Sequence, residues 1–245
     1  MSNKEQSQIT LTHDGKIKTV DLYTDEALEL ISQLWLKHYV NNKFTHAITW
    51  MGIPIIQFPE DIIMMEELIW KIKPDVIIES GLAHGGSAIF YASLLELIGK
   101  GKVIGIDIEI RKHNKLAIQN HPLAHRIQMI EGSSVSKEVI ENIKKMIKRS
   151  EKVLVVLDSN HSTEHVAKEL ELYKEFVTPE SYMVAMDGAQ AFCWDLPNGK
   201  PEWKHDNPLT AIEEFVNKNT NFQIDVHYDR LKVTSNPKGF LLRIK

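Results

Sequence analysis

Two carboxylates and a histidine have the residue types and spacing needed to remove a proton from a hydroxyl group. Asp158 and Asp187 each end a short apolar segment, and His161 follows three residues after Asp158. If these segments are neighbouring strands, both carboxylates can bind a hard divalent cation, and the histidine can act as general base. Other interpretations remain open, because Asp158 or Ser159 could cap a helix and His161 could be a solvated loop histidine.

Glu79 and the glycine-rich segment that follows it form a candidate cofactor site. The segment 79–87 reads E-S-G-L-A-H-G-G-S, in which Gly81 and its neighbouring glycines would let the backbone approach a ligand closely, ahead of Ser87. The G-x-G-x-x-G pattern that binds a dinucleotide pyrophosphate is absent, which argues against NAD or FAD. An acidic residue before a looser glycine-rich turn favours the aminoacyl end of S-adenosylmethionine. Tight packing alone could also explain the glycines.

Polar residues at two further strand ends complete the candidate cofactor site. Asp107 lies 26 residues beyond Gly81, close to where an acidic residue accepts hydrogen bonds from a ribose diol. Ser133 and Ser134 can border an adenine ring and hydrogen-bond its edge. Alternatively, Asp107 could be a helix cap or a surface acid, and Ser134 or Ser136 could cap the following helix.

The elements that would position these residues alternate between strand and helix. Five apolar segments with β-rich composition are separated by stretches of helical character, at 75–80, 102–108, 126–132, 152–158 and 181–187. This alternation predicts a parallel sheet buried on both faces. Near the end of the chain, segments 222–229 and 239–245 flank a Pro237–Gly239 turn without a helix, which predicts an antiparallel pair at one sheet edge. We therefore expect an α/β, Rossmann-like methyltransferase fold with a mostly parallel seven-stranded sheet and helices on both faces.

The N-terminal quarter lies outside this pattern. Residues 1–20 are a polar arm that could form an edge strand or contact a neighbouring subunit. A helix capped by Thr24 should follow, with an apolar stripe that includes Leu28, Ile31, Leu34 and Trp35. An aromatic loop then leads to a second helix over 61–71. We assign 1–60 to an arm, a helix and the aromatic loop, and 61–245 to the methyltransferase domain.

Composition excludes several classes of function. The 245 residues carry a net charge of −4, so the basic surface of a nucleic-acid-binding protein is not expected. The single cysteine, Cys193, fits a packing role in a reducing cytoplasm. The first twenty residues contain no apolar segment typical of a signal peptide, and no stretch is long and apolar enough for a membrane span. We expect a cytoplasmic protein with neither nucleic acid nor membrane as partner.

Several of these motifs resemble a known family. The chain from about Thr49 to its C-terminus is similar to cephalosporin hydroxylase-like and rhamnosyl O-methyltransferases, a family that includes macrolide-sugar O-methyltransferases. The resemblance rests on five motifs: T-W-M-G-I-P-I-I-Q-F-P-E-D (49–61), I-E-S-G-L-A-H-G-G-S (78–87), G-I-D-I (105–108), D-S-N-H-S-T-E-H-V (158–166) and N-P-K-G-F-L (236–241).

The resemblance implies a function and a role for each candidate residue. It implies a Rossmann-like enzyme that uses S-adenosylmethionine, commonly with Mg²⁺, to methylate a hydroxyl of a sugar or secondary metabolite. Carried over by position, the cofactor contacts are Glu79, Gly81, Asp107 and Ser134, the metal ligands are Asp158 and Asp187, and the base is His161. One departure concerns the metal, because this chain has Met186 where the family usually has a glutamate, so we expect Mg²⁺ to be held weakly or to be absent.

Two other classes of function remain as alternatives. One is a cofactor-binding subunit without catalysis, suggested by Met186, and the other is a nicotinamide-dependent oxidoreductase. Oxygen chemistry is not expected, because no two-histidine-one-carboxylate set has suitable spacing. Aromatic residues in 44–58 and in 192–203 could stack on the acceptor, although Trp50 and Trp194 could equally pack in the core or against a subunit. The family resemblance and the apolar first helix predict a homo-oligomer.

Overall fold

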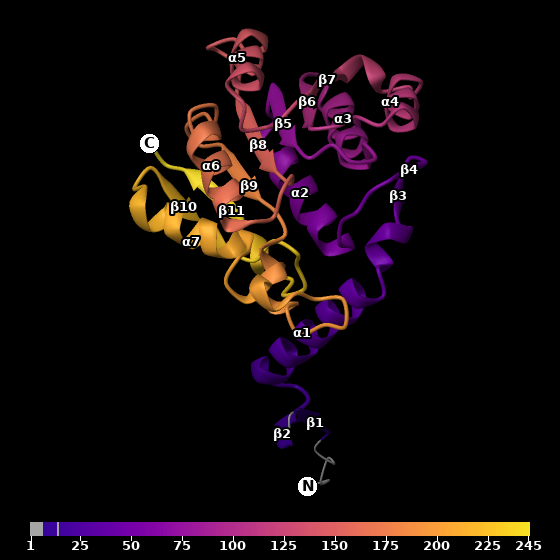
Figure 1. Ribbon diagram of the computed structural model, residues 1–245, viewed down its shortest axis with the longest axis vertical. Coiled ribbons are helices and arrows are strands. Elements are labelled where there is room, and N and C mark those ends of the chain that lie inside the picture. The colour runs from indigo at the N-terminus through magenta and orange to yellow at the C-terminus, as the bar shows by residue number, and fades with distance from the viewer. Residues whose placement is uncertain (1–6, 14) are drawn as a thin grey trace, which may run out of the picture.

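Seven strands form one sheet at the centre of the protein (Figure 1). The computed structural model describes residues 7–13 and 15–245. The strands of this sheet are β5 (Val76–Ser80), β6 (Lys102–Asp107), β7 (Ile127–Glu131), β8 (Val153–Leu157), β9 (Tyr182–Ala185), β10 (Phe222–Ile224) and β11 (Phe240–Arg243). Their spatial order is β10-β11-β9-β8-β5-β6-β7, with parallel pairing from β9 to β7 and antiparallel pairing of β11 with both of its neighbours. The expected Rossmann-like sheet is confirmed.

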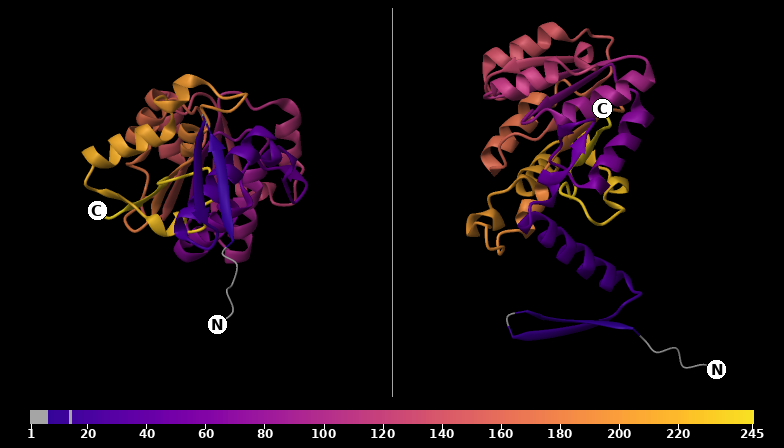
Figure 2. Two further views of the ribbon diagram at one scale, coloured as in Figure 1. Left: turned by 90° about the horizontal axis from the view of Figure 1, so that it is seen from below. Right: turned by 90° about the vertical axis from the view of Figure 1, so that its right-hand side faces the viewer.

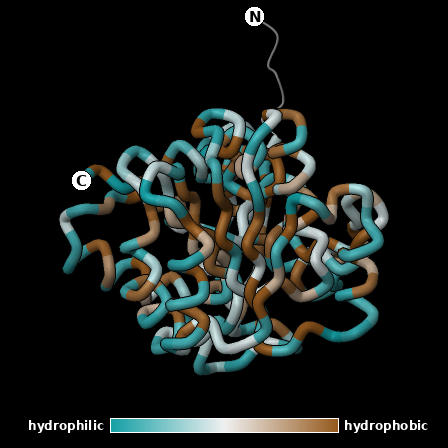
Figure 3. Tube along the Cα trace, turned by 90° about the horizontal axis from the view of Figure 1, so that it is seen from above, coloured by the Kyte–Doolittle hydropathy of each residue, from teal (hydrophilic) through white to brown (hydrophobic). Residues whose placement is uncertain are grey.

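Helices cover both faces of the sheet because its strands are apolar on both sides. In β5, Ile77 packs against one helical layer, whereas Val76 and Ile78 pack against the other. The first layer contains α2 (Pro59–Ile72), α3 (Gly86–Ile98) and α4 (Lys112–Gln119), and the second contains α5 (Lys137–Met146), α6 (Thr163–Tyr173) and α7 (Pro208–Lys218). Seen from above, hydrophobic segments run through the centre of the molecule (Figure 3).

Helix N-termini decide between two of the open interpretations. Ser162 caps α6, with its hydroxyl accepting a hydrogen bond from the His165 backbone N–H, so neither Asp158 nor Ser159 caps that helix. Ser136 caps α5 in the same way, which leaves Ser134 free for another role. Asp158, Ser159 and Ser134 therefore do not cap these helices, and their side chains can take part in ligand binding.

The antiparallel pair expected at one sheet edge is confirmed, but the segment between its two strands differs from the prediction. Strand β11 lies between β9 and β10, and β10 covers only the first three residues of the predicted segment 222–229. The rest forms a 3₁₀ helix, η5 (Val226–Asp229), because the Asp225 carboxylate accepts the His227 N–H and Tyr228 is buried against Phe240. The prediction that no helical element separates the two strands was wrong.

The N-terminal segment projects from the body of the protein (Figure 2). Strands β1 (Gln8–His13) and β2 (Lys16–Asp21) form an antiparallel hairpin, and α1 (Asp25–Asn41) connects it to the body. Thr24 caps α1 as expected, but much of the predicted apolar stripe lies in solvent: Leu28, Ile31, Leu34 and Trp35 are 41–47% exposed. Within residues 7–13 and 15–245, no helix has the length and apolar character to cross a membrane.

The aromatic loop returns the chain from α1 to the sheet. It contains a 3₁₀ helix, η1 (Phe44–Ala47), and two short paired strands, β3 (Thr49–Trp50) and β4 (Ile53–Pro54). Gly86 at the start of α3 is needed for this path, because a Cβ there would lie 2.1 Å from the Pro54 carbonyl oxygen. The loop is therefore held against the glycine-rich turn that follows β5.

Candidate active site

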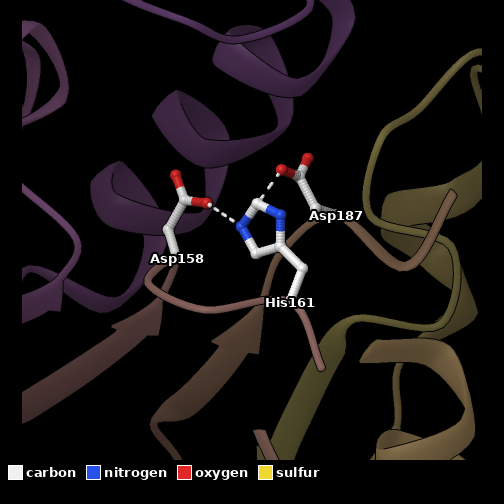
Figure 4. Close-up of side chains that lie close together, drawn as sticks. All are labelled: Asp158, His161 and Asp187. Atoms are coloured by element: carbon white, nitrogen blue, oxygen red, sulfur yellow. Dashed lines mark ion pairs between the residues drawn. The ribbon is translucent and has the colours of Figure 1, made fainter. Parts of the chain in front are cut away.

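Asp158, His161 and Asp187 meet where β8 and β9 end (Figure 4). Asp158 directly follows β8, and Met186 alone separates Asp187 from β9, so the parallel pairing of these strands brings the two carboxylates to one edge. His161 Nε2 lies 3.5 Å from Asp158 Oδ1 and 3.3 Å from Asp187 Oδ2. One ligand atom from each residue lies within 4.8 Å of the others. The sequence-predicted catalytic set is thus assembled in space.

The charged groups of this cluster change the pKa values of one another. Burial raises the pKa of Asp158 to about 6, although the adjacent His161 opposes the shift. Burial lowers the pKa of His161, but the carboxylates of Asp187 and Asp158 outweigh it and raise that pKa to about 9. The two carboxylates therefore favour the protonated form of the His161 imidazole. The cluster therefore favours a positive charge between Asp158 and Asp187.

A second layer of polar residues fixes Asp187. The Asp187 backbone has a left-handed conformation, with φ of +58°, and its N–H donates to Asn236 Oδ1 at 3.0 Å. Asn236 is fully buried beside Ser235, whose N–H and hydroxyl lie 2.8 Å from Asp61 Oδ2. Burial raises the pKa of Asp61 to about 6, and its hydrogen bonds with Thr234 and Ser235 oppose that shift. This layer explains why N-P-K-G, although distant in sequence, belongs to the site.

Gly81 lets the first loop of the sheet contact the catalytic strand. Its φ is +93°, and a Cβ at this position would lie 1.8 Å from the Asp158 carbonyl oxygen. No other residue fits without moving the backbone. The glycine therefore has a structural role, and the same close contact brings the candidate cofactor loop beside Asp158.

Four of the predicted cofactor residues line a cavity of about 280 Å³. Gly81, Asp107, Ser133 and Ser134 all line it, together with Ile106, Ile108, Gly132, Ser159, Asn160 and His165. The Asp107 carboxylate accepts hydrogen bonds from the backbone N–H groups of Ala83 (2.9 Å) and Glu109 (3.1 Å), which fixes its orientation. Asp107 does not cap α4, which begins at Lys112 after a cap at Arg111.

A smaller cavity of about 30 Å³ connects this region to the catalytic cluster through shared residues. Gly81, Ser87 and Asp158 line it with the Pro54–Gln57 segment. Glu79 lines none of these cavities, because it is fully buried in β5, and both its carboxylate oxygens have no hydrogen-bond partner among the described residues. Burial raises the pKa of Glu79 well above its usual range, with the hydroxyl of Ser87 opposing the shift.

A third cavity, of about 260 Å³, opens beside His161 and Asp187. Its walls come from α1, η1, the aromatic loop and two 3₁₀ helices, η3 (Gly188–Phe192) and η4 (Pro201–Lys204); they include Val40, Thr45, His46, Ile56, Phe58, Cys193 and Trp203. Cys193 is buried and unpaired by disulfide, as expected of a packing residue. The catalytic cluster contributes to this cavity through two residues and to the small cavity through Asp158, so it lies between the two sides.

The aromatic residues divide between packing and the third cavity. Trp50 packs edge-on against Phe90 at 4.8 Å, and its Nε1 donates to Ser93 Oγ at 3.1 Å, so it supports the core. Trp194 is 39% exposed, with the Lys204 ammonium 5.2 Å from its ring. Trp203 lines the third cavity instead.

Sequence reasoning missed two residues beside the first cavity. His165 lines the cavity, and Glu169 lies one helical turn further along α6 with no exposed surface. The signal was present, because His165 and Glu169 are four residues apart and so share a face of α6 with the buried Tyr173. Polar residues at this spacing suggest a solvent face until the neighbouring strands are placed.

Comparisons with known proteins identify the family to which the chain belongs. The sheet order with its antiparallel edge defines a Rossmann-like α/β fold. Residues 42–244 match the family Rhamnosyl O-methyltransferase/CmcI, and the chain belongs to that family. The rhamnosyl O-methyltransferase of Mycobacterium tuberculosis is 28% identical over 222 residues, which cover 88% of this chain and 86% of that protein.

Solved structures agree on the fold. An apo-structure of CmcI has a TM-score of 0.60 at 16% identity and covers 82% of this chain and 77% of that chain. A CmcI structure with Mg and SAM has a TM-score of 0.58 at 17% identity, with 82% and 78% covered. The expected family, fold and enzyme class, an S-adenosylmethionine-dependent O-methyltransferase, are confirmed.

Proposed function

We propose that the protein transfers the methyl group of S-adenosylmethionine to a hydroxyl of a sugar or secondary metabolite. The observation that carries this proposal is the position of the Asp158–His161–Asp187 cluster between two kinds of cavity. On one side lie the predicted adenosyl contacts, and on the other lies a cavity of a size suited to a small ring, with both apolar and polar side chains in its walls. A methyl group and a hydroxyl could meet at the cluster.

His161 is the proposed general base. Its Nε2 faces both carboxylates. Because His161 also lines the third cavity, a hydroxyl bound there would lie next to the imidazole. The two carboxylates stabilise the protonated imidazole, which cannot act as a base. His161 can accept a proton only after its imidazole has become neutral. Compensation of the carboxylate charge is therefore part of the proposed mechanism.

The residues present fit a divalent cation. Asp158 and Asp187 supply two carboxylate oxygens within reach of a common ion, and water would complete the octahedron that Mg²⁺ requires. Such an ion would supply polarisation of the acceptor hydroxyl. The third ligand atom of the cluster is a histidine nitrogen, which suits Mg²⁺ less well, and this is why we assign His161 to proton transfer.

The cofactor would extend from the cluster into the first cavity. Asp107 is the proposed acceptor for the ribose hydroxyls, Ser133 and Ser134 would border the adenine, and Gly81 with Ser87 would leave room for the aminoacyl end. Glu79 is fully buried and lines none of these cavities, and the Ser87 hydroxyl beside it opposes the rise of its pKa. A contact between Glu79 and the cofactor's ammonium group would therefore run through Ser87 or a water molecule.

The projecting segment supports assembly into a homo-oligomer, which we propose in the cytoplasm. An exposed apolar stripe on α1 and a hairpin outside the main sheet are costly for an isolated monomer. Light scattering should report a mass above the 28.1 kDa of one chain, and Leu34→Glu should lower it, whereas the α1 variant Glu29→Gln should not. A wild-type protein that stays at the monomer mass at micromolar concentration contradicts assembly.

Activity can be tested before the acceptor is identified. The protein is incubated with S-adenosylmethionine and a panel of glycosides and phenols, and release of S-adenosylhomocysteine is measured with Mg²⁺ and with a chelator. We expect release with at least one hydroxyl acceptor, and its loss on chelation. Turnover that is indifferent to the chelator would remove the metal from the proposal, and cofactor binding without turnover on any acceptor would favour a non-catalytic subunit.

A further inference from the structure

One face of α6 carries buried polar side chains where a packed helix would normally present apolar ones. His165, Glu169 and Tyr173 follow one another at four-residue spacing, which places them on this face. Glu169 and Tyr173 have no exposed surface. Because a carboxylate removed from water is costly unless hydrogen bonds compensate it, packing alone does not explain this face.

These side chains connect the ends of two different strands. Beyond β8, Ser159 Oγ donates to Glu169 Oε1 at 2.7 Å and lies 3.2 Å from His165 Nε2. The same Nε2 lies 3.2 Å from Ser134 Oγ, beyond β7. The Tyr173 hydroxyl donates to the Ser134 carbonyl oxygen at 2.9 Å. Ser134 is thus held at its backbone by α6 and contacted at its hydroxyl by the end of a hydrogen-bonded relay, Glu169–Ser159–His165.

The chemistry of the groups fixes the direction of the hydrogen bonds. A carboxylate can only accept, so the single hydrogen of the Ser159 hydroxyl is committed to Glu169. Ser159 Oγ can then receive a hydrogen from His165 but cannot give one, which places the ring hydrogen on Nε2. A protonated Nε2 cannot accept, so the Ser134 hydroxyl keeps its own hydrogen. In the part of the chain that the structure describes, no other acceptor lies within hydrogen-bond distance of Ser134 Oγ.

The position of this free hydrogen matters because Ser134 lines the first cavity with Asp107 and His165. A cofactor with its reacting methyl at the catalytic cluster and its ribose at Asp107 must place its base further along the same cavity. That remaining wall contains Ser133, Ser134 and His165. The Ser134 hydroxyl would therefore meet the edge of the base.

We propose that the relay sets Ser134 as a hydrogen-bond donor that reads the unprotonated N1 of the base, and that it thereby selects adenine over hypoxanthine. The inference rests on the proposed binding of S-adenosylmethionine in this cavity. Adenine has a lone pair on N1, whereas hypoxanthine carries a hydrogen there and would oppose one donor to another. Ser134 is the recognition residue, and Glu169, Ser159 and His165 are positioning residues that fix its polarity.

The test compares two cofactor analogues by calorimetric titration, S-adenosylhomocysteine and S-inosylhomocysteine. We expect wild type to bind the adenosyl compound about tenfold more tightly or better, since a site built for one hydrogen-bond pattern rejects its opposite. Ser134→Ala should weaken adenosyl binding by about five- to tenfold and bring the ratio of the two dissociation constants towards one. Ile108→Val, which lines the same cavity without a polar side chain, is the matched control and should retain the ratio.

The relay itself is tested without changing the recognition residue. The Glu169 carboxylate also lies 3.6 Å from His165 Nε2, so both acceptors must be removed to reverse the relay. The double variant Ser159→Ala, Glu169→Leu frees Nε2 to accept from Ser134, so the ratio should fall, whereas Ser159→Thr keeps the relay and should retain the ratio. Loss of packing would weaken both analogues together and leave the ratio unchanged, and thermal unfolding of each variant checks its folding. Equal affinities in wild type, or an unchanged ratio in Ser134→Ala, would overturn the relay alone. A wild type that does not bind S-adenosylhomocysteine would overturn the proposed function as well.

Discussion

The two sides of the catalytic cluster are built in different ways. The first cavity takes Gly81, Asp107 and Ser134 from the ends of three strands of one continuous sheet. The third cavity takes its walls from α1, the aromatic loop, η3 and η4, which come from opposite ends of the chain and belong to no common sheet. The regular part of the fold therefore positions the proposed cofactor, and irregular segments shape the proposed acceptor site. This division predicts that substitutions on one side leave binding on the other side intact.

The largest effect is expected at the cluster between the two sides. His161→Ala should lower the rate of methyl transfer by roughly 10²–10⁴, the usual contribution of a positioned general base. Because His161 lines the acceptor cavity and not the first cavity, the dissociation constant for S-adenosylhomocysteine should change little. Single-turnover kinetics and calorimetry measure the two quantities.

The same variant separates a base from a metal ligand. Mn²⁺ affinity, followed by electron paramagnetic resonance, should be similar in wild type and His161→Ala if only Asp158 and Asp187 bind the ion. A large loss of Mn²⁺ affinity would make His161 a ligand, and full activity of the variant would remove it from the mechanism.

A smaller but selective effect is expected on the cofactor side. Asp107→Ala removes a carboxylate that would accept hydrogen bonds from ribose, and it should weaken S-adenosylhomocysteine binding by about ten- to a hundredfold. The KM of the acceptor should be unaffected. Because the Asp107 carboxylate also accepts from Ala83 and Glu109, Asp107→Asn, which retains an acceptor oxygen, is the control for local folding. Equal cofactor affinity in wild type and a folded Asp107→Ala would show that this residue only orders the loop.

Substitutions in the third cavity should change the KM of the acceptor without changing the affinity for the cofactor. Trp203→Ala removes an aromatic wall of the third cavity and should raise the KM of an acceptor found by screening by about three- to tenfold. Trp194→Ala is the matched control, because Trp194 is partly exposed and does not line that cavity. If both variants change the KM equally, the third cavity does not bind the acceptor.

The contrast between the two sides also separates what the sequence predicts from what it does not. Strand periodicity locates strand ends, and parallel pairing brings such ends together, so Asp107, Asp158 and Asp187 could be placed in advance. Helical periodicity identifies a face but not its neighbour. The stripe of α1 could therefore be predicted as a face but not given a partner, and its Trp35 is 47% exposed; the spacing of His165 and Glu169 likewise indicates a shared face of α6 but not the burial of Glu169.

Long-range contacts between irregular segments were beyond prediction for a related reason. The hydrogen bond from Asp187 N–H to Asn236 Oδ1 joins residues 49 positions apart, and no periodic pattern encodes it. The different surroundings of Trp50 and Trp203 likewise depend on how loops fold back on the sheet. The division at residue 60, with the arm, helix and aromatic loop as part of the same domain or as an oligomer contact, stays a prediction.

The smallest effect concerns Met186, which stands where the family resemblance predicts a carboxylate. Met186 is 3% exposed in the core, and Gln57 Nε2 lies 3.5 Å from its sulfur, so a carboxylate at this position would meet a hydrogen-bond donor already in place. Met186→Glu should tighten Mg²⁺ binding a few-fold by adding an oxygen ligand beside Asp187. Without the ion, a third carboxylate near Asp158 and Asp187 adds like-charge repulsion and should lower the melting temperature. Met186→Gln has almost the same shape without the charge, and it should do neither. Calorimetric Mg²⁺ titration and thermal unfolding with and without chelator measure both effects, and equal ion affinity in the two variants would show that the side chain at 186 cannot reach the ion.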